Sequence, residues 1–414
     1  LFDDLFTRAW ALLDEAARRV LMVMTFFPIS ANGDALAATA DVHGYSFEHA
    51  VERLVDLALL DVQQDDLNNT PRYALHPLVR VFANAKLINK LNIEIQARER
   101  WITHYISITR QVGFCWNDLS RLLLLDNEHE TICAVVEWLF EQKRYEEVIT
   151  LERGSGYYFH VRGLWKKQLF LNELRITAAQ RAGNFQREVR GIAYRIEMLS
   201  RQGELREAKK WSMQLQEVIA DRQIPEDLLW ALPMSQAFVS VAGCEYDLAV
   251  QAWREFVSLT SSSNAHLRTN YGRRWLATCL YFTGEFEEAR TVFEEVSKTA
   301  SQLGHERSLA VSQVMLGYID VAQNKLVEAE QRLQDNLRRA LHYQDRENIA
   351  RIQLGFARLH MAHGAFSAAR TALAEAIDLF ERLGMRRGLA EAHEVLADLE
   401  FRVLAEMNEH HGNC

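Results

Sequence analysis

A short phrase that recurs between residues 203 and 369 limits what this chain can fold into. Each copy starts with Gly, Asn or Cys and has Ala five positions later. The copies are Gly203-Glu-Leu-Arg-Glu-Ala208, Cys244-Glu-Tyr-Asp-Leu-Ala249, Gly284-Glu-Phe-Glu-Glu-Ala289, Asn324-Lys-Leu-Val-Glu-Ala329 and Gly364-Ala-Phe-Ser-Ala-Ala369. They begin in steps of 41, 40, 40 and 40 residues, and a fixed step predicts a solenoid of helix pairs. Gly or Asn suits the left-handed end of a helix, and Ala allows a close helix crossing.

Composition narrows the class of protein. A chain of 414 residues is too long for one core, and 5 prolines and 19 glycines favour a mainly helical protein. The net charge of -9 argues against non-specific nucleic-acid binding, and no apolar run approaches the roughly 20 residues that span a membrane. Five isolated cysteines are typical of thiols in a reducing, cytoplasmic compartment. Because Leu1 runs straight into a helical pattern, we expect the chain to be a fragment of a longer protein.

The first 90 residues predict a winged-helix domain. Helical patterns cover 3–13, 15–27, 34–40 and 46–57, and two short strands, 59–63 and 72–76, follow around a turn at 65–71. A winged helix invites a DNA-binding hypothesis. The fourth helix, however, carries Glu48, Glu52 and Asp56 against one Arg53, and such a helix would repel phosphates.

The same region resembles the winged-helix domain of STAND signal-transduction ATPases of the NB-ARC type. The resemblance rests on Trp10–Glu15, Arg19–Phe27, Leu54–Leu60 and Arg72–Ala83. Leu75-His76-Pro77 occupies the place of the family's Met-His-Asp motif, whose histidine contacts the β-phosphate of ADP. The resemblance implies that role for His76, although Pro77 departs from the motif. The alternative is a histidine that satisfies local backbone groups at a strand-to-helix junction.

The catalytic half of that family is not in this sequence. No Gly-x-x-x-x-Gly-Lys-Ser/Thr phosphate loop occurs, so we expect no ATP hydrolysis by this chain and no cofactor in it. We also expect no catalytic residues and no metal site. ADP or ATP is implied only for a longer parent protein, whose nucleotide-binding domain would be a partner within the same polypeptide.

The rest of the chain divides into a helical linker at 91–126, a superhelix at 127–404 and a tail at 405–414. Further partial copies of the phrase, at 143–148 and 163–168, extend the array backwards. The repeats resemble tetratricopeptide repeats, because Ala289 is followed by Phe293 at the position of that family's second-helix aromatic. Repeats of the HEAT type have a similar length and are the structural alternative.

The resemblance also implies a concave groove lined by the first helix of each repeat. The register places nine principal candidates there for a peptide, protein or small-molecule ligand: Met234, Phe238, Tyr271, Arg274, Tyr281, Tyr318, Arg351, Arg358 and Met361. Aromatic and arginine side chains suit a peptide or an acidic ligand. Two alternatives stay open: the superhelix fills its own groove, or domains outside this chain cover it.

Together these features predict a regulatory, ligand-sensing module of a STAND ATPase. It would hold the nucleotide domain in an ADP-bound, inhibited state until a ligand binds the groove. The alternative from another class is a free-standing scaffold for partner proteins. A phosphate loop encoded upstream of Leu1 would decide for the first hypothesis, and a start codon at that point for the second.

Overall fold

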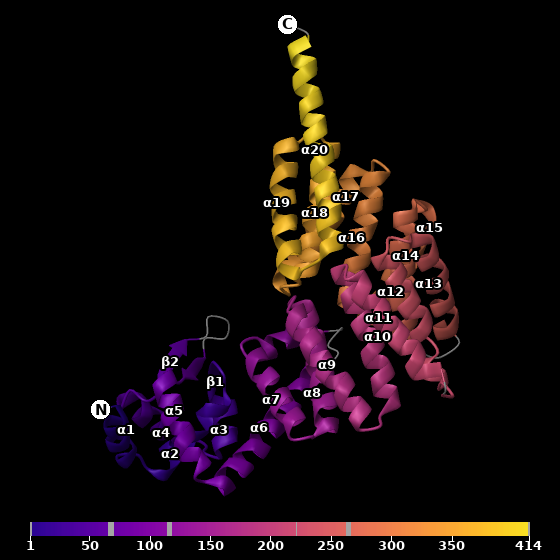
Figure 1. The fold of residues 1–414 in the computed structure, drawn as a ribbon. Coiled ribbons are helices and arrows are strands. Elements are labelled where there is room, and N and C mark those ends of the chain that lie inside the picture. Colours follow the sequence, from indigo (N-terminus) through magenta and orange to yellow (C-terminus); the bar gives the residue numbers. More distant parts are fainter. Residues whose placement is uncertain (1, 65–69, 114–117, 221, 262–265, 413–414) are drawn as a thin grey trace. The chain divides into compact units, whose positions relative to one another are not determined.

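The computed structural model describes residues 2–64, 70–113, 118–220, 222–261 and 266–412 (Figure 1). As expected, the chain is mainly helical and carries one small sheet. It forms two compact units, residues 1–114 with 121–156 and residues 115–120 with 157–414. The predicted turn includes residues 65–69, and the predicted tail includes 413 and 414, all of which lie outside the described residues.

The first unit consists of short helices around a three-stranded sheet. Its elements are α1 (Phe2–Ala11), α2 (Glu15–Val23), η1 (Met24–Phe26), β1 (Ser30–Asn32), α3 (Gly33–Ala40), α4 (Tyr45–Asp56), β2 (Asp61–Gln64), β3 (Pro71–Ala74), α5 (Pro77–Ile88), α6 (Leu91–Val112) and α7 (His129–Glu141). A 3-10 segment η2 (Leu119–Leu125) and α8 (Tyr145–Val161) have residues in both units. The Asp14 side chain accepts a hydrogen bond from the Ala17 amide at 2.8 Å, which confirms its predicted capping of α2.

The sheet has one strand more than the sequence predicted. Its order is β1-β3-β2, with both pairs antiparallel, so the predicted hairpin of β2 and β3 is extended by β1. Ser30 of β1 and Asp61 of β2 both pair with Ala74 of β3. A three-residue strand is too short to show alternation in the sequence, which explains why β1 was not predicted.

A buried ion pair joins the sheet of the first unit to the residues just before α7. The Arg72 guanidinium of β3 donates to Glu128 Oε1 at 2.6 Å and to Ser30 Oγ at 2.9 Å. Glu128, only 2% exposed, also accepts hydrogen bonds from the Tyr105 hydroxyl of α6 and, at 3.0 Å, from Asn32 Nδ2. One carboxylate therefore connects β1, β3, α6 and the start of α7.

The second unit is an array of helix pairs. Its helices are α9 (Trp165–Arg181), α10 (Phe185–Gln202), α11 (Leu205–Ala220), α12 (Ala231–Ala242), α13 (Tyr246–Ser261), α14 (His266–Thr283), α15 (Phe286–Gln302), α16 (Glu306–Ala322), α17 (Leu326–His342), α18 (Arg346–Ala362), α19 (Phe366–Leu383) and α20 (Arg386–Gly412), with a 3-10 turn η3 (Glu226–Leu228) before α12. Most neighbours in the sequence pack against each other along this array.

The recurring phrase has the local conformation that the sequence predicted. Its first residues all adopt positive φ angles: 76° at Gly203, 58° at Cys244, 85° at Gly284, 58° at Asn324 and 71° at Gly364. The alanines five positions later, at 208, 249, 289, 329 and 369, are fully buried. A Gly or Asn that ends one helix and an Ala that seats the next thus account for the joints of the array.

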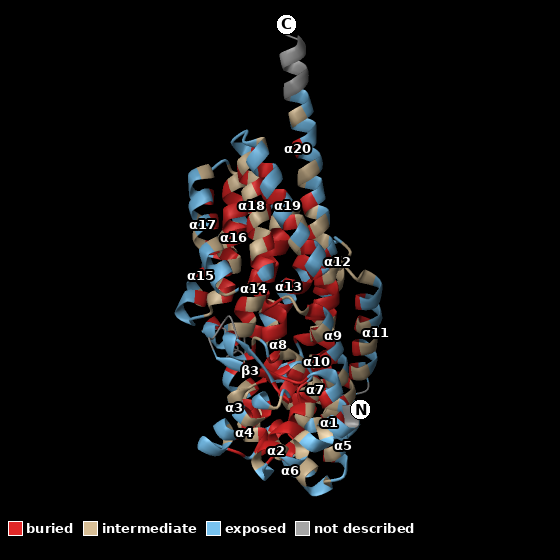
Figure 2. Ribbon diagram, turned by 90° about the vertical axis from the view of Figure 1, so that its left-hand side faces the viewer, coloured by how far each residue is buried: buried red, intermediate tan, exposed pale blue. Residues whose placement is uncertain are grey.

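Two layers of helices are distinguished by their contacts and burial. Helices α10 and α12 pack together, as do α14 with α16, α16 with α18 and α18 with α20, and these form the inner layer. Buried positions are concentrated on α10, α12, α14, α16 and α18, whereas α11, α15 and α17 present long exposed faces and α20 is largely exposed (Figure 2). The inner layer also returns on itself, because α10 contacts α20 and Arg386 Nη2 lies 2.8 Å from Glu204 Oε1.

None of the helices in the described part of the chain combines the length and the apolar character needed to cross a membrane.

Candidate functional site

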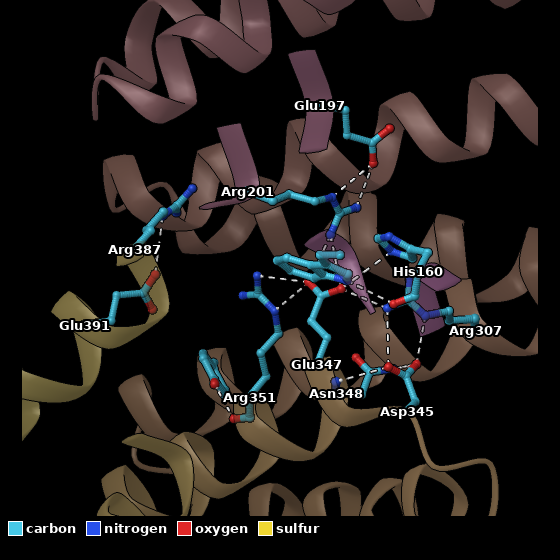
Figure 3. A network of polar contacts seen from close by, with 12 residues as sticks. His160, Glu197, Arg201, Arg307, Asp345, Glu347, Asn348, Arg351, Arg387 and Glu391 are labelled. Carbon is cyan, nitrogen blue, oxygen red and sulfur yellow. Dashed lines mark hydrogen bonds and ion pairs between the residues drawn. The ribbon is translucent and has the colours of Figure 1, made fainter. Parts of the chain in front are cut away.

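Glu347 lies at the centre of a buried network of charged side chains in the inner layer of the second unit (Figure 3). The guanidinium of Arg201, from α10, donates to both Glu347 oxygens at 2.9 and 3.2 Å, across 146 residues of sequence. It also donates to Glu197 Oε1 at 3.0 Å. Arg351, one turn along α18, approaches the same Glu347 carboxylate at 3.3 Å.

Arg307 of α16 extends this network to the start of α18. Its Nε donates to Asp345 Oδ2 at 2.7 Å, and its Nη2 donates to Glu347 Oε2 at 2.8 Å. Asp345 also accepts a hydrogen bond from Asn348 Nδ2 at 2.9 Å. Burial raises the pKa of Glu347, but the nearby guanidinium groups outweigh burial and hold that pKa well below its usual range.

Arg201 and Arg274 show opposite electrostatic balances in the same interior. Burial lowers the pKa of Arg201, but the carboxylates of Glu347 and Glu197 outweigh burial and raise it above its ordinary value. Arg274 of α14 is only 8% exposed, and no described carboxylate forms an ion pair with it. Burial and the neighbouring Arg201 charge lower the pKa of Arg274 to about 10. Its guanidinium lies over the rings of Tyr271 and Trp275, at 5.4 and 5.3 Å from their centroids.

His160, in the part of α8 that belongs to the second unit, borders the network in its neutral form. Its Nε2 lies 3.7 Å from Glu347 Oε2, and its ring stacks on Trp165. Burial, reinforced by the positive charges of Arg307 and Arg201, lowers the pKa of His160 well below its ordinary value. Its Nδ1 is buried and makes no hydrogen bond.

A second group of charged and aromatic side chains lies where α14, α16, α18 and α20 meet. Arg358 Nη2 lies 3.6 Å from Glu391 Oε2, and the Arg358 guanidinium lies 4.7 Å from the centre of the Tyr318 ring. Arg387 also pairs with Glu391, at 3.4 Å, and lies over Phe282. The Tyr318 hydroxyl donates to the carbonyl oxygen of Arg351, which connects this group to the network around Glu347.

The nine predicted groove residues fall into three places. Arg274, Tyr271 and Arg351 belong to the Glu347 network; Tyr281, Tyr318 and Arg358 belong to the second group; Met234, Phe238 and Met361 lie in apolar clusters. All nine side chains are buried or half-buried. Ligand binding by these residues stays a prediction, and the side chains of the inner layer themselves occupy this face.

Sequence reasoning missed His160, Glu197, Arg201, Arg307, Asp345, Glu347, Arg387 and Glu391. Five of them had a detectable signal. Carrying the groove register back by two repeats from Tyr281 reaches Arg201, and carrying it back by one helical turn from Arg351 reaches Glu347. One repeat forward from Arg351 lies Glu391, and one repeat to either side of Glu347 lie Arg307 and Arg387. His160, Glu197 and Asp345 had no such signal, because only the return of α10 to the end of the array reveals which inner-layer charges meet.

His76 lies in the first unit, at the start of α5. Its side chain is exposed, and its Nδ1 accepts a hydrogen bond from the Leu78 amide at 3.3 Å. Pro77 occupies the first turn of α5, where a missing backbone N–H carries no cost. His76 therefore caps a helix, and its imidazole edge is also open to solvent; contact with a nucleotide stays a prediction.

A cavity of about 430 Å³ lies beside the network, between the ends of the α15–α18 helices. Its lining includes Arg307, Asp345 and Asn348, so the network reaches one wall of the cavity. Arg339 and Tyr343 contribute another wall. The volume is in the range of small-molecule sites.

Acid is expected to destabilise the second unit through His305, the residue that caps α16. Its Nδ1 accepts a hydrogen bond from the Ser308 amide at 3.1 Å. Burial, with the charges of Arg274 and Arg307, lowers the pKa of His305 to about 4. An unfolded histidine takes up a proton near pH 6.5, so stability should be complete above that pH and fall between about pH 6.5 and 4.

The expected loss from pH 7 to pH 5 is on the order of 1–2 kcal/mol, measured by urea unfolding. His305→Asn keeps a capping oxygen but does not titrate. The free energy of unfolding of this variant should therefore fall by about 1–2 kcal/mol less between pH 7 and pH 5. An equal fall in the free energy of unfolding in the unaltered chain and in His305→Asn would show that His305 does not cause the acid sensitivity.

No protein-family model matches the chain. A curated relative, the transcription activator GutR of Bacillus subtilis (strain 168), is 26% identical over 160 residues, which cover 36% of this chain and 19% of the relative. The chain thus matches about a fifth of that relative's length.

Two solved structures are similar to this chain. A Rap protein in complex with competence and sporulation factor has 9% identity and a TM-score of 0.47, over 79% of this chain and 92% of that one. A STAND protein with a tetratricopeptide repeat sensor from Pyrococcus horikoshii has 11% identity and a TM-score of 0.43, over 99% of this chain and 67% of that one.

Proposed function

We propose that this chain is the regulatory, ligand-sensing part of a STAND-type signal-transduction ATPase. The observation that carries the proposal is the concentration of buried arginines in the inner layer of the second unit. Natural cores rarely bury a guanidinium without a full complement of partners, because desolvating the charge is costly. Such a group is typical of a site that a ligand completes. We take the repeats to have a period of 40 residues and their inner layer to be the sensing surface.

The first unit would be the part that contacts the nucleotide-binding domain. We take it to be a winged helix, in keeping with the resemblance of Arg72–Ala83. His76 is exposed at the start of α5, and the same helix exposes an apolar stripe: Leu78 is 46% exposed, Val81 70% and Ile88 63%. Apolar side chains exposed at helical spacing next to a candidate nucleotide contact suit docking to another domain. In the resting protein, His76 would contact ADP while this stripe holds the domain closed.

The likeness to a transcription activator supports a regulatory role. The acidic face of α4 argues against DNA binding by this unit itself. The output would therefore belong to another segment of the whole protein. A free-standing scaffold is the competing function, and the encoded sequence upstream of Leu1 separates the two, since only a STAND ATPase requires a phosphate loop there.

Two substitutions test the docking role in the parent ATPase. His76→Ala should speed ADP release roughly tenfold, because it removes one charged-ligand hydrogen bond. Val81→Asp should speed it at least as much, because it places a charge in an apolar contact. Release is followed with a fluorescent ADP analogue.

Val327→Asp is the matched control, since Val327 is an equally exposed valine, 78% exposed, on α17. If His76→Ala and Val81→Asp release ADP as slowly as this control, the docking role is refuted. Val81→Asp should leave the melting temperature of the isolated chain unchanged, because Val81 is exposed. His76→Ala should lower it slightly, because the substitution removes the cap of α5.

A further inference from the structure

The inner layer of the second unit has an unbalanced charge in a chain that is acidic as a whole. Around Glu347, four guanidinium groups meet three carboxylates: Arg201, Arg274, Arg307 and Arg351 against Glu197, Asp345 and Glu347. His160 adds no charge, because burial and the arginines keep it neutral. The complete chain carries a net charge of -9. The excess of positive charge is therefore local to this interior.

Arg274 accounts for the excess. The other three arginines each pair with a described carboxylate, at 2.9 Å for Arg201, 2.8 Å for Arg307 and 3.3 Å for Arg351. Arg274 is as buried as Arg201, and its guanidinium lies over the faces of Tyr271 and Trp275 without an ion pair to a described carboxylate. Aromatic faces offset only a small part of the cost of burying a charge. Without an anion, Arg274 should destabilise the fold.

We propose that Arg274, together with the neighbouring Arg201 and Arg307, binds the oxyanion of a small ligand that carries a phosphate or a carboxylate group. This inference rests on the proposed ligand-sensing function and names the chemistry of the ligand. A guanidinium has five N–H donors in a planar fork that matches phosphate and carboxylate oxygens. The unpaired charge excludes a cationic ligand, and a neutral ligand would leave it uncompensated.

The geometry favours a small ligand over a peptide. The side chains predicted to line the groove are buried or half-buried, and α10 contacts α20 at the end of the array, which leaves less exposed surface for a peptide than an open groove would have. The cavity of about 430 Å³ shares Arg307 with the network and has room for a small organic anion. The positive charge of Arg307 also contributes to lowering the pKa of Arg274, which places the two guanidinium groups in one electrostatic site.

The test measures anion binding by the 414-residue chain. Inorganic phosphate and citrate are added at constant ionic strength, with chloride as the reference anion, and the melting temperature and the heat of binding are recorded. At least one of the two anions should raise the melting temperature of the unaltered chain. Arg274→Gln should melt no lower than the unaltered chain in chloride, because it removes an unpaired buried charge, and should bind the anion roughly tenfold more weakly or not at all.

Arg273→Gln is the matched control. Arg273 is the preceding residue of α14, is 37% exposed and lies 3.8 Å from Glu295, so its substitution makes the same charge change outside the site. It should keep the full response to the anion. Arg274→Lys keeps the charge but loses the fork, and should respond less than the unaltered chain. This variant keeps the test decisive if the glutamine variant does not fold.

Two results would overturn the inference. One is the absence of any phosphate- or citrate-dependent shift in the unaltered chain, and the other is an undiminished shift in both Arg274 variants. Neither result bears on the docking role of His76 and Val81, which is measured by ADP release in the parent protein. Failure of the anion site is therefore distinguishable from failure of the proposed function.

Discussion

Replacing Glu347 by glutamine is expected to lower the free energy of unfolding of the second unit by about 3–5 kcal/mol. Among the described residues, Glu347 is the carboxylate that pairs with three arginines: Arg201, Arg307 and Arg351. Its side chain is 5% exposed, so water cannot take its place. The glutamine keeps the shape but leaves the buried guanidinium groups with too little negative charge. Removing one partner of a buried pair costs far more than the pair itself contributes.

Hydrogen–deuterium exchange in peptides from α16 and α18 gives this measurement for the second unit alone. Glu294→Gln serves as the control, since Glu294 is exposed on α15, and its substitution should change stability by less than about 0.5 kcal/mol. Adding Arg351→Met to Glu347→Gln should recover part of the loss, because Arg351 pairs with no other described carboxylate and its unpaired charge is then removed. A loss no larger than that of the control would show that Glu347 does not hold the inner layer together.

Glu347 and Arg274 belong to the same network but are expected to have different roles, one in stability and the other in ligand binding. Substitution of Glu347 should destabilise the fold, whereas substitution of Arg274 should not, although both side chains are buried at the same level. A residue whose removal maintains stability but abolishes binding is typical of a functional site, where stability is sacrificed for activity. The two variants together therefore test whether the inner layer is a core or a site.

The helix joints of the second unit could be predicted from sequence because their causes are local. Gly and Asn favour the positive φ that ends a helix, although Cys244 also adopts it, and a small Ala suits the point where two helices cross, so a pair such as Gly203 and Ala208 indicates a joint. The main helices of the first unit were predictable for the same reason, from apolar spacing and caps such as Asp14. Strand β1 was not, because three residues carry no period.

The charged network could be predicted only in part, because its members meet through the path of the whole array. Arg201 and Glu347 are 146 residues apart and make contact only because the inner layer returns on itself. The register of the repeats predicts which face of each helix points inward, and it included Arg274 and Arg351. The register does not predict how closely α10 approaches the last helices of the array. That distance decides whether an inward-facing arginine contacts water, a ligand or a carboxylate.

Replacing Arg72 by methionine is expected to destabilise the first unit by about 3–5 kcal/mol. Arg72 donates to Glu128 at 2.6 Å, to Ser30 Oγ at 2.9 Å and to the carbonyl oxygen of Asn127 at 3.1 Å. Its loss leaves the Glu128 carboxylate charged and buried with only the neutral donors Tyr105 and Asn32. Exchange of the β3 and α7 amides should therefore accelerate together, since the pair joins those two elements.

A double-mutant cycle separates the pair from its surroundings. Glu128→Gln added to Arg72→Met leaves no unpaired charge and keeps an oxygen for the Tyr105 hydroxyl, so the double variant should be more stable than Arg72→Met alone. Arg8→Met is the control, because Arg8 is 79% exposed in its pair with Asp4 and should contribute less than about 1 kcal/mol. Simple addition of the two single losses would mean that Arg72 and Glu128 act independently. A positive coupling confined to this pair would show that one buried carboxylate holds β3 and the start of α7 together.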